Sequence, residues 1–121
     1  MVVFDSTHKT DFEKFLYNSC IHDAFLTDIK IFTPNRISVT ATNHIYNQQY
    51  HFVFDNVHWC SYSQGDWHGE NEQVLSLSLE ESIPCQPQIS DGIILLFQMF
   101  SGSEIYIVCD TVNVEQTVVI A

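Results

Sequence analysis

The chain has 121 residues and a net charge of −11, because 15 Asp and Glu residues are balanced by only 4 Lys and Arg. Nucleic acids and anionic membranes are bound mainly through Lys and Arg, so this balance excludes both as partners. The composition is nevertheless 45% hydrophobic and 13% aromatic, which is enough to bury a core. We therefore predict a single domain spanning residues 1–121, and the lack of a secretory or membrane-spanning pattern places it in the cytoplasm.

The negative charge is concentrated after Arg36, the last cation in the chain. Ten of the 15 acidic residues, and no Lys or Arg, lie in the 85 residues from Ile37 onward. In strands with one buried face these acids must point outward, and the others gather in loops. The sequence thus predicts a one-sided acidic surface, which would attract a basic protein partner.

The first predicted element is a short amphipathic helix at residues 10–19. Thr10 and Glu13 form the Thr-x-x-Glu pattern of a capping box, and apolar residues follow at helical spacing. Those apolar residues are Phe12, Phe15, Leu16 and Cys20. The stripe is narrow and aromatic, which is typical of a helix laid across one face of a sheet.

From Ala24 onward the apolar residues alternate with a period of two, as they do in strands. The connections are either too short or too rich in Gly and Pro to hold the crossover helices of a parallel sheet. The pattern predicts an α+β fold with one short N-terminal helix packed on a single antiparallel meander of about seven or eight strands. The expected strands are at residues 25–32, 37–41, 50–54, 57–60, 75–79, 93–100, 105–108 and 112–120. The run at 93–100 is apolar on both faces and is therefore the most buried.

A hairpin drawn around Asp55-Asn56 yields a candidate metal site. Pairing Phe54 with Val57 places His51, His58 and Cys60 on one face, where their side chains could hold zinc, with His68 completing the set. The competing interpretation is that an outward face collects polar residues by default.

The segment at residues 61–71 is the predicted long exposed loop and holds two of the four glycines. Trp67 and His68 lie inside it, and a large aromatic on such a loop either packs back onto the domain or serves as a contact anchor. The acidic residues around them are Asp66, Glu70 and Glu72. We predict that these five residues form an interaction site for a partner with a basic rim and an apolar centre.

No catalytic residue is predicted. The sequence has no nucleophile elbow, phosphate loop or dinucleotide fingerprint, and its four cysteines form no Cys-x-x-Cys pair. We expect free thiols and no cofactor, zinc being the alternative. His22 and Asp23 are adjacent in an extended segment, so their side chains point to opposite faces and cannot form an acid–base dyad.

Three segments resemble a loose group of small bacterial proteins, some of which are classed as immunity proteins of toxin systems. The segments are His22-Asp23-Ala24, Phe54-Asp55-Asn56-Val57, and Gly102-Ser103-Glu104-Ile105-Tyr106-Ile107 before Cys109. Proteins of this group begin with a short helix and continue as an antiparallel meander. The resemblance implies that fold, with no catalytic residues and no established ligand.

Three functions follow as hypotheses. The first is a non-enzymatic interaction domain that binds a basic protein, with immunity toward a basic toxin domain as its most concrete version. The second is a small metal-binding domain or metal-dependent enzyme built on His51, His58 and Cys60. The third is a homodimer joined through the apolar C-terminal strands, which requires an exposed edge there.

Overall fold

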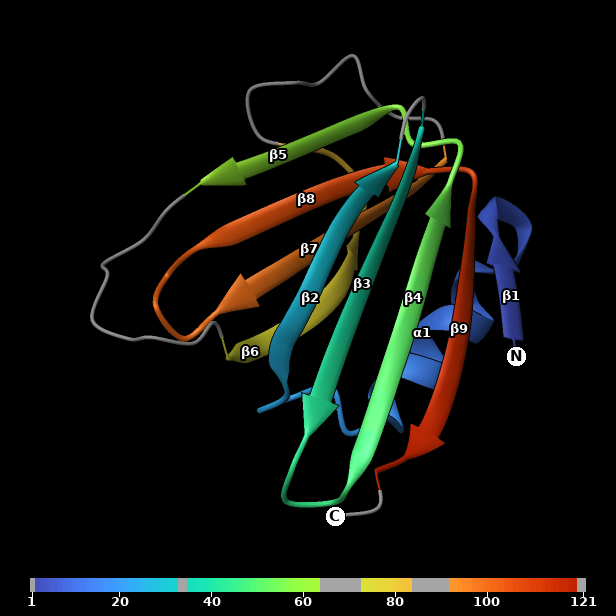
Figure 1. The fold of residues 1–121 in the computed structure, drawn as a ribbon. Coiled ribbons are helices and arrows are strands. Elements are labelled where there is room, and N and C mark those ends of the chain that lie inside the picture. The colour runs from blue at the N-terminus through green and yellow to red at the C-terminus, as the bar shows by residue number, and fades with distance from the viewer. Residues whose placement is uncertain (1, 33–34, 64–72, 84–91, 120–121) are drawn as a thin grey trace.

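The computed structural model describes residues 2–32, 35–63, 73–83 and 92–119. The described chain forms one short α-helix and two antiparallel sheets (Figure 1). In spatial order, sheet A holds β1 (Val2–Asp5), β9 (Thr111–Val118), β4 (Gln48–Asp55), β3 (Arg36–Asn43) and β2 (Phe25–Phe32). Sheet B holds β5 (Trp59–Ser63), β8 (Glu104–Cys109), β7 (Ile93–Met99) and β6 (Val74–Glu80). The predicted α+β class with antiparallel pairing is confirmed, but the nine strands form two sheets and not a single one.

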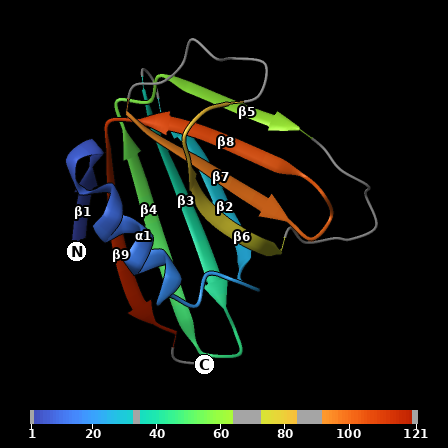
Figure 2. The ribbon, with the colours of Figure 1, turned by 180° about the vertical axis from the view of Figure 1, so that it is seen from behind.

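The helix α1 (Lys9–Tyr17) follows a 3-10 turn, η1 (Ser6–His8), and shares the inner face of sheet A with sheet B (Figure 2). The face of α1 that contacts the sheet is aromatic, since the ring of Phe12 stacks on that of Phe4 in β1 with a centroid distance of 4.7 Å. The predicted helix is confirmed, but it begins earlier than the capping-box pattern indicated. His8 occupies the N-cap position, but its side chain makes no capping hydrogen bond to the helix, and its Nδ1 instead lies 2.7 Å from Oδ1 of Asp5, the residue that caps the preceding 3-10 turn.

The main core lies between the two sheets. Tyr50, Phe52 and Phe54 occupy alternate positions of β4, all point inward, and all are fully buried. Phe97 of β7 meets the last two of these rings edge-on, with centroid distances of 6.2 and 6.4 Å. These contacts fix sheet B against sheet A. The prediction that the strand near residues 93–100 is the most buried is confirmed, because six of the seven residues of β7 are buried.

The chain changes sheets at a corner, and there the predicted hairpin around Asp55-Asn56 is wrong. β4 pairs along its length with β9 on one side and with β3 on the other, so no edge is left for the segment that follows. Asn56 has a φ of +52°, and beyond it the chain leaves sheet A and enters β5, which pairs with β8. The chain returns from sheet B to sheet A at Asp110, between β8 and β9. This second crossing lies beside the first, since the Asp110 N–H donates to the Asp55 carbonyl at 3.1 Å.

β3 and β4 form a hairpin whose turn, residues 44–47, closes on Asn47 with φ +55°. The C-terminal strands β7 and β8 each lie between two neighbours, whereas β1 covers β9 only along residues 111–114. In the described part of the chain, the exposed edge that the predicted homodimer needs is therefore limited to residues 115–118 of β9. Along the described parts of the chain, no helix has the length and apolar character to cross a membrane.

Candidate functional site

The residues predicted as the interaction loop, Asp66, Trp67, His68, Glu70 and Glu72, lie outside the described residues. The chain enters that segment from Ser63 at the end of β5 and leaves it at Gln73, which bridges to Phe25 at the start of β2.

The residues predicted to bind metal are divided between the sheets. His51 lies on the outer face of sheet A, where its Nδ1 is 3.0 Å from the hydroxyl of Thr40. Cys60 lies in sheet B opposite Ile107, and partial burial raises the pKa of its thiol. The predicted hairpin around Asp55-Asn56, which would have placed His51 and Cys60 on one face, does not form. Within the described ranges, no three His, Cys, Asp or Glu side chains lie close enough to hold a metal ion.

His58 forms a different contact, one that the sequence analysis missed. Its Nε2 lies 2.6 Å from Oδ1 of Asp110, and both side chains are about half exposed at 51% and 48%. The two residues are 52 positions apart and come together only because both crossings pass through the same corner. No local pattern in the sequence could have revealed this pair.

A second charged contact fixes the same corner from sheet A. The Nε of Arg36 donates to Oδ1 of Asp55 at 2.6 Å, and the amide of Asn113 donates to Oδ2 at 3.1 Å. Among the described residues, no hydroxyl or thiol hydrogen-bonds to His58 or Asp110, so the pair lacks the nucleophile of a catalytic triad. These contacts hold the crossings in place.

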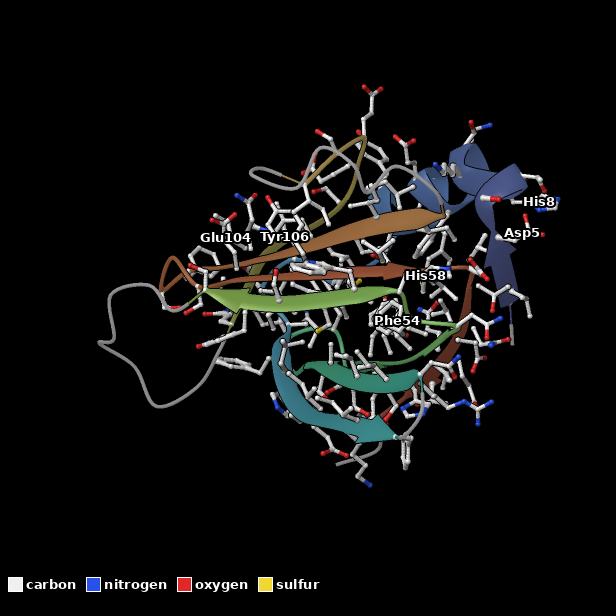
Figure 3. The ribbon with its side chains drawn as sticks, turned by 90° about the horizontal axis from the view of Figure 1, so that it is seen from above. Asp5, His8, Phe54, His58, Glu104 and Tyr106 are labelled. Carbon is white, nitrogen blue, oxygen red and sulfur yellow. The ribbon has the colours of Figure 1, made fainter. Side chains whose placement is uncertain are left out.

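The outer face of sheet B is acidic. The register places Glu104 and Tyr106 of β8 and Glu80 of β6 on this face, because they lie opposite Gln98, Leu96 and Ile94, whereas Phe97 points to the core. Figure 3 shows Glu104 and Tyr106 on the side of sheet B away from β2 and β3. We call Glu80, Glu104 and Tyr106 the acidic face.

No cation offsets the charge of the acidic face from within its own sheet. All Lys and Arg residues precede Ile37, so they belong to α1 and to the first strands of sheet A, while every strand of sheet B follows Ile37. The pKa of Tyr106 reflects this environment, because partial burial raises it first and the neighbouring Glu104 and Glu80 carboxylates raise it further. The acidity noticed in the sequence is therefore unbalanced on sheet B, whereas sheet A carries both signs.

The acidic face lies beside a small apolar cluster, to which Tyr106 also belongs. Ile94 and Val108 are buried on this side of sheet B with Ile83, and the aromatic side chains of Trp59 and Tyr106 pack against them while staying partly exposed. The Nε1 of Trp59 has no hydrogen-bond partner among the described residues. An aromatic centre beside carboxylates is an arrangement suited to binding another protein.

A separate charged group marks the N-terminal turn. The Thr7 hydroxyl, 2.6 Å from Asp5 Oδ1, is the main reason that the pKa of Asp5 falls from its usual 3.8 to about 2. The side chain of His8, at 2.7 Å, and the backbone N–H of Thr7 add to the effect.

We expect a carboxyl titration of Asp5, followed by NMR, to show a midpoint of about 2. Since the folded pKa lies below the unfolded value of 3.8, the stabilisation is present above that pH and is lost as the pH falls toward 2. Thr7→Val removes the hydroxyl and should raise the midpoint, whereas Thr7→Ser keeps it and should not. An unchanged midpoint in Thr7→Val would show that the hydroxyl is not the cause.

No family model, curated protein or solved structure matches this chain. The function is therefore inferred from the positions and charges of its own residues.

Proposed function

We propose that this protein is a non-enzymatic binding domain that uses the acidic face of sheet B to bind a basic protein. The observation that carries the proposal is the pair of carboxylates, Glu80 and Glu104, beside Tyr106 on a sheet without Lys or Arg.

Two physical effects support this function. Uncompensated negative charge raises the local concentration of a cationic partner and speeds encounter, mainly through the association rate. The partly exposed rings of Tyr106 and Trp59 supply large contact area at a small entropic cost, which is why such residues dominate binding energy at interfaces. The carboxylates thus raise the association rate, and the aromatic side chains contribute most of the binding energy.

Immunity toward a basic toxin domain is the concrete form of the proposal. It rests on the resemblance carried by His22-Asp23-Ala24 and by the segment from Gly102 to Ile107. That last segment includes Glu104 and Tyr106, so it supplies two of the three residues of the acidic face. A toxin neutralised in this way must present a Lys- or Arg-rich surface, since only cations can pair with these carboxylates.

Charge reversal at Glu104 tests the proposal. In a pull-down from cells of the source organism, with bound proteins identified by mass spectrometry, we expect a basic partner that is retained at low salt and released at high salt. Glu104→Lys should lower the association rate constant with that partner about threefold or more at low ionic strength. The rate can be measured by surface plasmon resonance.

Glu115→Lys is the matched control, because Glu115 is an exposed glutamate in a strand but lies on the outer face of sheet A. It should reduce binding much less, although both variants change the net charge equally. Capture of acidic partners alone, or equal losses in the two variants, would contradict binding through sheet B.

A further inference from the structure

Strand β2 is an edge strand with an accessible side. Among the residues that the structure describes, it pairs with β3 alone, and one further bridge, between Phe25 and Gln73, occupies only its first residue. Its last six residues are all exposed. An edge strand of this kind presents unpaired N–H and C=O groups that can pair with another strand.

Both faces of β2 carry side chains that favour such pairing. Ile29 and Ile31 point to the inner side of sheet A, where they lie opposite the core residues Val39 and Ile37, yet they are 48% and 73% exposed. Asp28 and Lys30 point to the outer side, with Lys30 Nζ at 3.4 Å from Asp28 Oδ2. The edge thus displays apolar surface on one side and one charge of each sign on the other.

We propose that β2 pairs in antiparallel fashion with β2 of a second copy of this chain, around a two-fold axis at Ile29. In this register Asp28 lies opposite Lys30 of the partner subunit, and Lys30 opposite the partner's Asp28. The same sequence therefore forms two opposite-charge pairs across the interface, while Ile29 meets its own counterpart on the inner side.

Other symmetric registers lose this complementarity. An axis at Asp28 or at Lys30 places that residue opposite its own copy, so like charges meet. An axis at Ile31 places Lys30 opposite Phe32 and leaves Asp28 without a counterpart. The irregularity between Leu26 and Asp28 leaves residues 28–32 as the regular part of the edge, and the two charged pairs and the Ile29 contact of the Ile29 register lie within that part.

The dimer joins the two five-stranded sheets into one continuous sheet and leaves the outer face of sheet B free. It is therefore independent of the proposed binding function, and each copy would present its own acidic face. The expected ladder is short, so the association is weak and concentration-dependent.

Sedimentation equilibrium of the full chain, up to about 300 µM, tests the proposal at concentrations where even a dimer with a Kd of about 100 µM is populated. We expect a monomer–dimer equilibrium for the wild type. Asp28→Lys and Lys30→Asp should each weaken it about tenfold or more, because two attractive pairs become two repulsive ones. Both residues are exposed, and circular dichroism will verify that the variants fold.

Mixing the two single variants should restore a heterodimer, since one chain then carries two lysines and the other two aspartates at the paired positions. The double variant Asp28→Lys/Lys30→Asp should dimerise by itself. A wild type that stays monomeric throughout, or single variants that dimerise as strongly as the wild type, would overturn the proposal.

A symmetric cysteine gives a second readout. Ile29→Cys places two thiols opposite each other at the two-fold axis, so mild oxidation should yield a covalent dimer on a non-reducing gel. Ile45→Cys, which is as exposed as Ile31 but lies in the turn between β3 and β4, is the control and should remain largely monomeric. Equal cross-linking in the two variants would place the contact elsewhere.

Discussion

Replacement of Phe97 by alanine is expected to lower the free energy of unfolding by about 3–5 kcal/mol. The ring is fully buried and lies edge-on to both Phe52 and Phe54, so its removal opens a cavity where sheet B meets sheet A. Urea denaturation followed by tryptophan fluorescence and by circular dichroism would measure the loss.

Tyr17→Ala is the control for this substitution, because Tyr17 is 90% exposed at the end of α1. It should change stability by no more than about 0.5 kcal/mol. A loss of less than about 1 kcal/mol in Phe97→Ala would mean that the two sheets do not depend on this aromatic contact.

Replacement of Gly92 by alanine is expected to cost about 2–4 kcal/mol. Gly92 precedes β7 with a φ of +88°, a conformation that side chains disfavour. A Cβ at this position would also lie 2.6 Å from the backbone carbonyl oxygen of Cys109, and relieving this clash would require a backbone shift that costs free energy. Thermal or urea unfolding would report the loss.

Gly102→Ala provides the comparison, since Gly102 has nearly the same φ of +89° in the connection between β7 and β8. The loss that the two variants share measures backbone strain, and the excess at Gly92 measures the contact with Cys109. Gly92→Ala with wild-type stability would show that the chain does not pass this closely beside the corner.

The elements that were predicted correctly are those that local periodicity defines. The helix was found because Phe12 and Leu16 recur at helical spacing, and both are buried in the structure. β7 was identified as the most buried strand because nearly every side chain from Ile93 onward is apolar. Each of these signals lies within one segment, because the buried positions of a helix or strand are apolar and its exposed positions are polar.

The predicted metal site shows where local reasoning stops. The alternation through Tyr50, Phe52 and Phe54 correctly indicated a buried face, but it did not indicate which strand would lie beside them. Two adjacent apolar runs resemble a hairpin, and here the structure instead pairs β4 with β9, a strand more than fifty residues later. Backbone hydrogen bonds are the same for every residue type, so they do not specify a partner, and His51 and Cys60 were divided between the sheets as a result.

The charge asymmetry along the chain was determined by the sequence alone. No Lys or Arg follows Arg36, so every strand after Ile37 must lack them wherever it folds. Helix position, strand periodicity and the antiparallel class were likewise determined locally. Only the tertiary structure decided that there are two sheets, that Glu80, Glu104 and Tyr106 share one face, and that His58 meets Asp110. The physical reason is that strand partners are selected by the packing of the whole core, since burying the β4 aromatics against Phe97 required the chain to leave sheet A at Asn56.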